Sequence, residues 1–473
     1  MLPGMRIRAA IALAAVAAAA CGGGGGTPPI RDLKPDDAPP PARTKTYKAE
    51  VDALVKPLIG GEWMAGVSIG LIHGDDVHYY GYGRARDGDA TPPNADTLFE
   101  IGSVTKVFTA LLLADAVARL VLDFADPVSK HLPEGRTLAA HAGGAITIEQ
   151  LATHSSGLPR MPDNFHPKDP ANPYADYTAD DLYGFLANHE PARAPGAGYE
   201  YSNLATALLG EIVTRLEARS FETLVVERVA APLRLDRTLV AIREGDANVA
   251  SGHDGEGKPA AHWDFDVFAA AGALRSTTRD MVAFVRANMA ADHELLGPAM
   301  KLAREPRFDA GDVGKVGLGW HIKGDGTCWH NGQTGGFHSF IAFDEKRDIG
   351  VVVLTNSGTG LGDVLGEALL LMLAGEPYAI ELPTTVKLSE EVLARYVGTY
   401  KLSAELVISI SRVDDRLYAQ ATGWPGFRLY ASSETEFYLR VADAQIQFEV
   451  GDRGAVKGLV LRQGGQEFRG PRL

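Results

Sequence analysis

Ser103 and Lys106 are three residues apart, where a loop gives way to a helical pattern. On a helix, side chains at this spacing share one face and can touch. A serine hydroxyl becomes a good nucleophile only beside a base, and desolvation lowers the pKa of a partly buried lysine toward that role. A free backbone N–H at the helix N-terminus, that of Ser103, could bind an oxyanion. Alone, the Ser-x-x-Lys spacing is common by chance, and it equally fits a solvated lysine and a capping serine.

Two more segments carry residues of the same chemistry. Tyr201 and Asn203 follow a glycine-rich loop and precede a helical pattern. Tyr201 could relay a proton, and the Asn203 amide could donate to a substrate carbonyl. His330, Asn331 and Gly332 precede Gln-Thr-Gly-Gly-Phe, whose glycines we place at the start of an edge strand that a ligand can approach closely. In this order the three motifs indicate a serine acyl-transfer site.

The same motifs carry a resemblance over about 47–378 to class C β-lactamases and DD-peptidases, a family of penicillin-recognising serine hydrolases. Segments 99–106, 151–158 and 272–277 support it. The resemblance implies Ser103 as the nucleophile, with Lys106 and Tyr201 as the proton-transfer pair, and it leaves open which of the two is the base. It implies an oxyanion hole from the N–H groups of Ser103 and Gln333. The residues that it implies for substrate binding are Asn203, His330, Asn331 and Gly332.

His330 stands where true class C β-lactamases have the lysine of Lys-Thr-Gly. An imidazole titrates near pH 6.5, so we expect it to offer little fixed attraction to a β-lactam carboxylate at about pH 7–8. DD-peptidase-like, D-aminopeptidase-like and esterase-like relatives have histidine here. The substrate therefore stays open among a β-lactam, a D-Ala peptide, a small ester and a D-amino-acid amide. A catalytically silent penicillin-binding or peptide-binding lipoprotein is the alternative from another class, and intact Ser103, Lys106 and Tyr201 argue against it.

An α+β domain over 46–380 must hold these residues. Alternation at 67–71 and 77–82 around a Gly-Asp-Asp turn predicts a β-hairpin. Apolar periodicity predicts helices over 47–58, 103–122, 148–154, 179–189, 204–218, 221–229, 278–289 and 364–373, and strands over 337–343 and 350–355. Strands at both ends predict one antiparallel sheet that pairs the N- and C-terminal strands. We expect helices on both faces and a helical insert.

A second, all-β domain is expected over 385–473. Short alternating runs with turn residues between them begin at about residue 396. Such regular spacing predicts a small antiparallel barrel or sandwich. It resembles the lipocalin-like domain often appended to this hydrolase family, and we expect a scaffolding role for it.

The N-terminus has the pattern of an export signal. Two arginines precede an apolar stretch of alanines that ends at Cys21, and this stretch is too short to span a bilayer. Residues 1–21 resemble a bacterial lipoprotein signal in which Cys21 is lipidated, although Ala18 stands where a larger aliphatic is usual. The alternative is an ordinary secretory signal. We expect residues 22–45, rich in Gly and Pro, to be a linker, and the protein to be exported, periplasmic or envelope-bound.

Composition excludes several classes. The 473 residues carry a net charge of −14, which repels nucleic acid. Two cysteines exclude a disulfide scaffold and a Cys-rich metal cluster. We expect neither metal nor organic cofactor, and a small-molecule or peptide substrate as the partner.

Two other candidate residues are interpreted as structural. Ser68, in a Gly-x-Ser-x-Gly sequence, lies inside an alternating strand. His154 is interpreted as a buried or capping residue.

Overall fold

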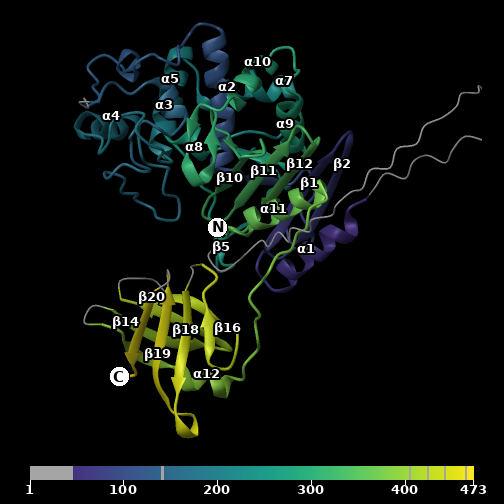
Figure 1. Ribbon diagram of the computed structural model, residues 1–473, viewed down its shortest axis with the longest axis vertical. Helices are drawn as coiled ribbons and strands as arrows, with labels where there is room; N and C mark the ends of the chain where they lie inside the picture. The colour runs from purple at the N-terminus through teal and green to yellow at the C-terminus, as the bar shows by residue number, and fades with distance from the viewer. Residues whose placement is uncertain (1–45, 140–142, 404–405, 423–425, 442–443, 464–465) are drawn as a thin grey trace, which may run out of the picture.

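A computed structural model describes residues 46–473, except 140–142, 404–405, 423–425, 442–443 and 464–465. It consists of a larger domain of helices and antiparallel sheet and a smaller all-β domain, placed one above the other along the long axis (Figure 1). The predicted signal (1–21), its Cys21 and the predicted linker (22–45) lie outside the described residues.

The larger domain is built on an eight-stranded sheet of order β2-β1-β12-β11-β10-β9-β8-β7. The predicted hairpin is formed by β1 (Gly66–His73) and β2 (Asp76–Gly83). Strand β1 pairs in antiparallel register with β12 (Ile349–Thr355). All seven residues of β12 are buried, as expected for a strand covered on both faces. The N- and C-terminal ends of the domain therefore join in one sheet, which confirms the predicted fold class.

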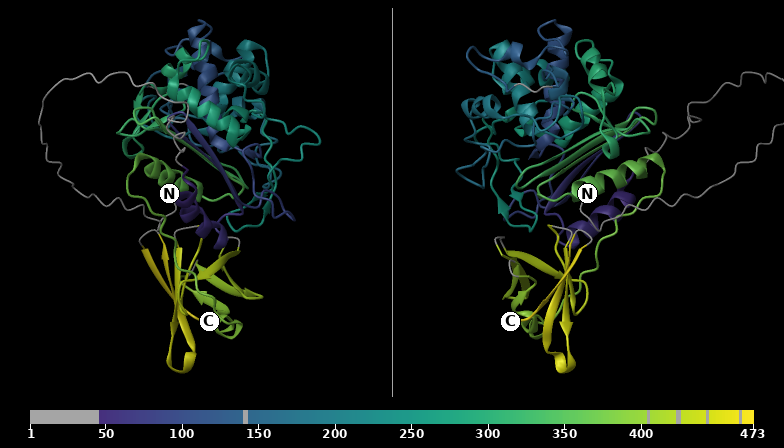
Figure 2. Two further views of the ribbon diagram at one scale, coloured as in Figure 1. Left: turned by 90° about the vertical axis from the view of Figure 1, so that its right-hand side faces the viewer. Right: turned by 60° about the vertical axis from the view of Figure 1, so that its left-hand side comes forward.

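Helices cover both faces of this sheet, as predicted. On one face α1 (Lys48–Gly60) and α11 (Leu361–Ala374) bury Val55, Leu58 and Leu365 against the strands. On the other, α9 (Thr278–Ala290) and the helical insert form a separate apolar core. In both views of Figure 2, α1 and α11 lie on the side of the sheet nearer the β domain, and the insert lies on the opposite side.

The predicted helices of this domain are present with changes at their ends, and the helix predicted over 221–229 becomes a π-helical turn after Val225. The predicted helix 103–122 is a 3-10 turn, Gly102–Val104, followed by α2 (Thr105–Ala118). Leu120 adopts a positive φ of 60°, which ends the helix there. The other helices of the domain are α3 (Ile148–Ala152), α4 (Ala179–Asn188), α5 (Asn203–Glu217), α6 (Phe221–Val225), α7 (Ala231–Leu233), α8 (Ala269–Gly272) and α10 (Gly297–Arg304). The three short helices α7, α8 and α10 were not predicted.

The expectation that Gly335 and Gly336 begin an edge strand is wrong, because they lead into β11 (His338–Asp344), which pairs with both β10 (Cys328–Gln333) and β12. Strand β10 carries the first part of the third motif and is partly an edge strand. It pairs along its length with β11. Its other side pairs with β9 (His321–Ile322) only at Cys328 and Trp329, so the end that leads to Gln333 has a free edge. The short strands elsewhere in the domain are β3 (Leu98–Glu100), β4 (Gly252–His253), β5 (Pro259–Ala260), β6 (Arg275–Thr277), β7 (Phe308–Asp309) and β8 (Lys315–Val316).

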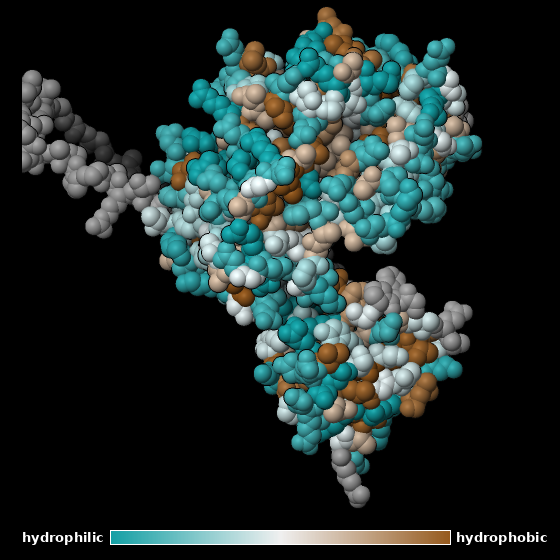
Figure 3. Space-filling model, turned by 180° about the vertical axis from the view of Figure 1, so that it is seen from behind, coloured by the Kyte–Doolittle hydropathy of each residue, from teal (hydrophilic) through white to brown (hydrophobic). Residues whose placement is uncertain are grey.

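The smaller domain is a nearly closed eight-stranded antiparallel barrel preceded by α12 (Glu390–Tyr396). Its strands run in sequence order: β13 (Gly398–Lys401), β14 (Val407–Val413), β15 (Arg416–Ala421), β16 (Gly426–Ala431), β17 (Glu436–Tyr438), β18 (Ala444–Val450), β19 (Val456–Gln463) and β20 (Gln466–Pro471). A bridge between Tyr400 and Arg472 brings the first and last strands together. Tyr396 stacks on Phe448 with ring centres 4.2 Å apart. The predicted small barrel is confirmed. From behind, the surface is notched between the two domains (Figure 3).

Candidate active site

Ser103 lies in the 3-10 turn that leads into α2 and packs against the free end of β10. Gly102 adopts a φ of +47°, and a Cβ on it would lie 2.7 Å from the backbone nitrogen of Gln333. A residue with a side chain would be strained there and would push the turn off the strand. Glycine at 102 therefore brings Ser103 close to the β10 backbone.

Lys106 is buried directly beneath the Ser103 hydroxyl. Its Nζ donates hydrogen bonds to Ser103 Oγ at 2.9 Å and to the carbonyl of Ala271, in α8, at 2.7 Å. The side chain is 2% exposed. This burial holds the pKa of Lys106 well below its ordinary 10.5, and the positive charge of Arg160 lowers it further. The site therefore favours a neutral amine beside the hydroxyl.

Tyr201 lies over the same lysine but has a different acid–base character. Lys106 Nζ is 4.9 Å from the centre of the Tyr201 ring. The Tyr201 hydroxyl is buried and makes no hydrogen bond of normal geometry to the described residues. Burial raises the pKa of Tyr201 to about 12, although the nearby Ser103 hydroxyl opposes this shift. Tyr201 is therefore protonated at neutral pH, whereas Lys106 is shifted toward its neutral form.

Ser202 places Tyr201 by capping α5. Its Oγ accepts from the Ala205 N–H at 2.9 Å and donates to the Pro159 carbonyl at 2.6 Å. Its own N–H donates to Nδ1 of His154 at 3.2 Å. The His154 ring lies 4.5 Å from that of Tyr201, and burial lowers the pKa of His154 well below 6.5. His154 is thus a buried neutral residue that positions the tyrosine loop, as expected.

Asn203, the first residue of α5, lies next to this loop. Its Nδ2 donates to the Met161 sulfur at 3.6 Å, and its Oδ1 is buried without a hydrogen-bond partner among the described residues. Its backbone N–H donates to the carbonyl of Arg160 at 3.0 Å. An unpaired buried amide oxygen is costly, so Oδ1 of Asn203 keeps an acceptor capacity that the described residues do not use.

Gly332 lets β10 approach the serine turn. A Cβ at this position would lie 2.0 Å from the carbonyl oxygen of Ile101 and 2.7 Å from the backbone nitrogen of Ser103. Together with the contact between Gly102 and Gln333, this brings the two backbone segments side by side. The structure therefore places the backbone nitrogens of Ser103 and Gln333 on facing segments, as a two-donor oxyanion site requires.

Gly332→Ala is expected to lower kcat by about 10²-fold, because the added methyl group would displace one oxyanion donor from the other. Steady-state kinetics on any hydrolysed ester would measure this loss. Gly324→Ala serves as a control, since a Cβ there meets nothing within 4 Å. Equal kcat values for both variants and the wild type would contradict the close packing.

His330 is buried and lies behind the wall of the site. Its side chain is 0% exposed, and its Nδ1 donates to the carbonyl of Asn331 at 2.6 Å. Burial, with the neighbouring His321 and Lys106, lowers the pKa of His330 well below 6.5. The expectation of an imidazole that titrates near pH 6.5 is therefore wrong, because the ring is buried and burial disfavours its charged form. The buried ring, which is not among the residues that line the cavity, also does not support the predicted role of His330 in substrate binding.

A network centred on Asp363 holds the open end of β10. The carboxylate, in the first turn of α11, accepts from Asn331 Nδ2 at 2.8 Å and from His338 Nε2 at 2.7 Å. Nδ1 of His338 in turn lies 3.3 Å from Gln333 Oε1. Asn331 and Gln333 are thereby linked to one anchoring carboxylate.

These residues surround a cavity of about 660 Å³. Five predicted site residues line it, namely Ser103, Tyr201, Asn331, Gly332 and Gln333. The predicted residues Lys106, Asn203 and His330 are not among the residues that line it. The cavity thus joins the serine turn, the tyrosine loop and β10, which are far apart in the sequence.

Comparison with known proteins agrees with this geometry. A family model described as Beta-lactamase matches residues 51–376, well over half of the chain. The chain belongs to the β-lactamase family. The Escherichia coli (strain K12) β-lactamase is 30% identical over 346 residues, which cover 65% of this chain and 88% of that protein. Penicillin-binding protein 4* of Bacillus subtilis (strain 168) is 24% identical over 423 residues, or 83% of this chain and 92% of that protein.

The second domain and the overall fold have counterparts as well. A family model described as a domain of unknown function (DUF3471) matches residues 382–470. The octameric penicillin-binding protein homologue from Pyrococcus abyssi superposes with a TM-score of 0.62 at 22% identity, covering 90% of this chain and 100% of that chain. At this identity the likeness concerns the fold, which the β-lactamase-family chain shares over both domains.

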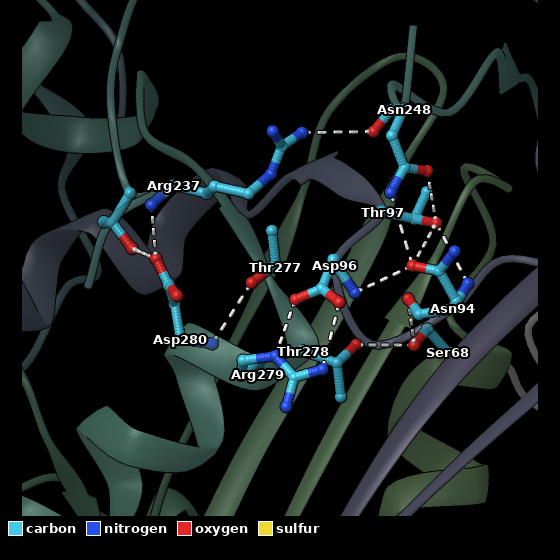
Figure 4. A network of polar contacts seen from close by, with 11 residues as sticks. Ser68, Asn94, Asp96, Thr97, Arg237, Asn248, Thr277, Thr278, Arg279 and Asp280 are labelled. Atoms are coloured by element: carbon cyan, nitrogen blue, oxygen red, sulfur yellow. Dashed lines mark hydrogen bonds and ion pairs between the residues drawn. The ribbon is translucent and has the colours of Figure 1, made fainter. Parts of the chain in front are cut away.

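Ser68 is structural in this family member. It lies on β1, where its hydroxyl accepts from Thr278 Oγ1 at 2.7 Å and donates to the Asn94 carbonyl at 3.2 Å (Figure 4). Ser68 is 1% exposed, so no substrate reaches it.

Among the described residues, no group of His, Cys, Asp and Glu could hold a metal ion, and no helix is long and apolar enough to cross a membrane.

Several cavity residues were not found from the sequence. Arg160, Tyr199, His321, His338, Asp363 and Arg440 line the cavity beside the predicted residues. His321 stacks on Trp329 with ring centres 4.6 Å apart, and burial lowers the pKa of His321 to about 4. Arg160 lies two residues after the 151–158 segment that supported the resemblance, so proximity to that segment was the available signal. Tyr199 lies two residues before Tyr201, and His338 directly follows the Gly-Gly-Phe sequence. The remaining three, His321, Asp363 and Arg440, lie outside the motifs and are brought to the cavity by the fold.

The β domain supplies part of the cavity wall. Arg440 and Val441 line it. The Arg440 guanidinium lies 3.8 Å from the centres of both the Trp63 and Tyr430 rings and donates to the Glu62 carbonyl at 2.8 Å. This cation–π sandwich joins the two domains beside the site.

Proposed function

We propose that this β-lactamase-family protein is a serine hydrolase that cleaves an amide or ester through an acyl-enzyme on Ser103, with Lys106 as the base. The observation that carries the proposal is the 2.9 Å contact between the buried Lys106 Nζ and the Ser103 hydroxyl that lines the cavity. A neutral amine at this distance accepts the hydroxyl proton as the oxygen attacks. The opposite shifts of the Lys106 and Tyr201 pKa values favour the lysine over the tyrosine as the base.

In the first step, Ser103 Oγ forms a bond to the substrate carbonyl carbon while its proton passes to Lys106 Nζ. The N–H groups of Ser103 and Gln333 donate to the resulting oxyanion, which offsets the charge that develops only in the transition state. Asn203 binds the acyl part of the substrate, and its unpaired Oδ1 accepts a donor from it. Asn331, held by Asp363, lies at the β10 side of the same cavity.

In the second step, the carbonyl re-forms and the bond to the leaving nitrogen or oxygen breaks. The leaving atom takes a proton from the Tyr201 hydroxyl, which Lys106 then reprotonates across the cluster. Water next attacks the acyl-enzyme, gives a proton to Lys106 and releases the acid, and Ser103 regains its hydrogen. No other reactant is required.

Intact-mass measurement with a fluorophosphonate and, separately, with a penicillin tests this proposal. Wild-type protein is expected to gain the mass of one phosphonyl group, because the reagent needs only an activated serine. A penicillin adduct in addition would favour a β-lactam or D-Ala peptide substrate, and its absence would favour an ester or a D-amino-acid amide. Folded protein that forms no adduct with either reagent would reject the hydrolase and favour a silent binding lipoprotein.

We also propose that the protein is exported and anchored through a lipid on Cys21. The apolar stretch that ends at Cys21, the glycines after it and the Pro-rich segment up to residue 45 support this proposal. A diacylated cysteine would provide stable attachment, since each buried CH₂ adds about 0.8 kcal/mol.

Cys21→Ala is expected to move the exported protein from the membrane fraction to the soluble fraction, because the acceptor thiol is lost. Detergent release of wild-type and variant protein, followed by immunoblotting of both fractions, measures the change. Cys328→Ala is the matched control, since that thiol is buried in β10 and its loss should leave the fractionation as it is. Wild-type protein found wholly in the soluble fraction would reject the anchor.

A further inference from the structure

The helical insert forms one wall of the cavity, and Arg160 places a permanent positive charge on that wall. Its guanidinium lies 5.1 Å from the centre of the Tyr201 ring, and the residue is exposed and lines the cavity. Its backbone carbonyl accepts the Asn203 N–H. The arginine therefore stands on the side of the cavity where Asn203 would receive the acyl part of a substrate.

This charge has no anionic partner in the described part of the chain. None of the carboxylates described there lies within ion-pair distance of Arg160, and its side chain makes no hydrogen bond to them. Glu200, adjacent to the tyrosine loop, pairs instead with Arg193 at 2.6 Å. The acid on the cavity wall, Asp363, is held on the sheet side by Asn331 and His338. The cavity is thus polarised, with a free cation on the helical wall.

The other basic side chains considered around the cavity, His330, Lys106 and Arg440, offer no such free cation. His330 is buried and stays neutral at physiological pH, and Lys106 is committed to Ser103 and Ala271. Arg440 lies between two aromatic rings and donates to the Glu62 carbonyl. Arg160 is therefore the cavity cation that is best placed to bind an anion. Its planar fork of N–H donors matches the two oxygens of a carboxylate.

We propose that Arg160 binds an anionic oxygen group, such as a carboxylate, on the acyl part of the substrate. This inference rests on the proposed hydrolase function and adds a substrate class to it: acyl groups that bear a negative charge remote from the scissile carbonyl. The net charge of −14 makes a local cation more important, because the rest of the protein repels such a substrate.

Two esters of equal acyl length test the inference: p-nitrophenyl hexanoate, which is neutral, and mono-p-nitrophenyl adipate, which ends in a carboxylate. The measured quantity is the ratio of kcat/KM for the adipate ester to that for the hexanoate ester. Wild-type protein is expected to favour the adipate ester, and Arg160→Ala to lower the ratio by about 10- to 100-fold, the usual effect of losing a charge-assisted hydrogen bond. Arg160→Lys should retain part of the preference, because it keeps the charge but not the planar fork.

Arg136→Ala is the matched control. Arg136 lies over the Tyr183 ring at 5.2 Å, much as Arg160 lies over Tyr201, but it pairs with Asp180 and does not line the cavity. Its loss should leave the ratio at the wild-type value. Because Arg160 also lowers the pKa of Lys106, the ratio is taken at several pH values, where a change in the base affects both esters equally.

The outcomes separate this inference from the proposed function. If Arg160→Ala, with a thermal midpoint like that of the wild type, hydrolyses both esters with an unchanged ratio, the anion site is overturned and the hydrolase stands. If both variants at position 160 fall to the same ratio while Arg136→Ala does not, charge and geometry are both needed, which supports a bidentate contact. A wild-type protein that hydrolyses neither ester and takes up no fluorophosphonate overturns both proposals.

Discussion

Ser103→Ala is expected to lower kcat/KM for every hydrolysed substrate by about 10⁴-fold or more, because no other group can form the acyl-enzyme. The variant should also take up no fluorophosphonate. Its fold should be retained, since the Ser103 side chain contacts Lys106 at the cavity surface rather than filling the core. Intact-mass spectrometry, ester kinetics and thermal unfolding on the same preparations give the three readouts.

Ser68→Ala is the control that tests whether Ser103 of the Ser-x-x-Lys motif or Ser68 of the Gly-x-Ser-x-Gly sequence is the nucleophile. This substitution removes a buried hydrogen bond to Thr278, so it should lower the free energy of unfolding by about 1 kcal/mol. It should leave labelling and turnover at wild-type levels. Labelling that persists in Ser103→Ala and disappears in Ser68→Ala, or in Ser156→Ala, would assign the nucleophile elsewhere.

The elements of this fold that could be predicted are those with a clear local signal in the sequence, such as apolar periodicity, a turn or a helix cap. The hairpin of β1 and β2 was predicted from apolar alternation and one turn, although seven successive residues of β1 are buried, and α5 was predicted from its apolar stripe. The capping box of Thr147 and Gln150 is present at the start of α3 as the local sequence indicates. In each case the residues that identify the element are close together in the sequence.

The elements that escaped prediction depend on contacts between distant segments. Strands β7, β8 and β9 are two residues long, and each is held by pairing with the next strand of the sheet, β7 with β8, β8 with β9 and β9 with β10. Helix α12 has seven residues, and its Tyr396 is held by packing on Phe448 inside the barrel. Such short elements have weak intrinsic preferences.

In the candidate site, too, the residue types could be predicted from the sequence, whereas the surroundings of each residue could not. Ser103, Lys106 and Tyr201 could be predicted because their residue types and spacing can be read directly from the sequence. The state of His330 could not, because its pKa depends on burial among His321, Lys106 and His154, which converge only in the fold. Arg160 and Asp363 likewise became site residues only when the helical insert and α11 met the free end of β10.

Lys106→Met is expected to lower kcat/KM by about 10³-fold, because the variant keeps an unbranched side chain that ends at Cε but loses the amine that acts as the base. In the wild type, kcat/KM should fall as the pH falls through the lowered pKa of Lys106, since protonation removes the base. This acid limb should lie well below pH 10.5, because burial and the charge of Arg160 both disfavour the ammonium form. Ester hydrolysis measured from acid to alkaline pH, together with thermal unfolding, tests both expectations.

Two further variants decide whether Lys106 acts as a base or only as a hydrogen-bond donor. Lys106→Arg keeps a donor but cannot deprotonate, so a folded arginine variant should be as inactive as the methionine variant at every pH. Tyr201→Phe should lose rate but keep the acid limb, because a phenol with a pKa of about 12 is protonated throughout that range. If Tyr201→Phe abolishes the limb and Lys106→Met retains it, the tyrosine is the base and the assignment is reversed. A limb that moves to higher pH in Arg160→Ala would show that the arginine's charge is felt at the lysine, because removing a nearby cation makes the ammonium form easier to reach.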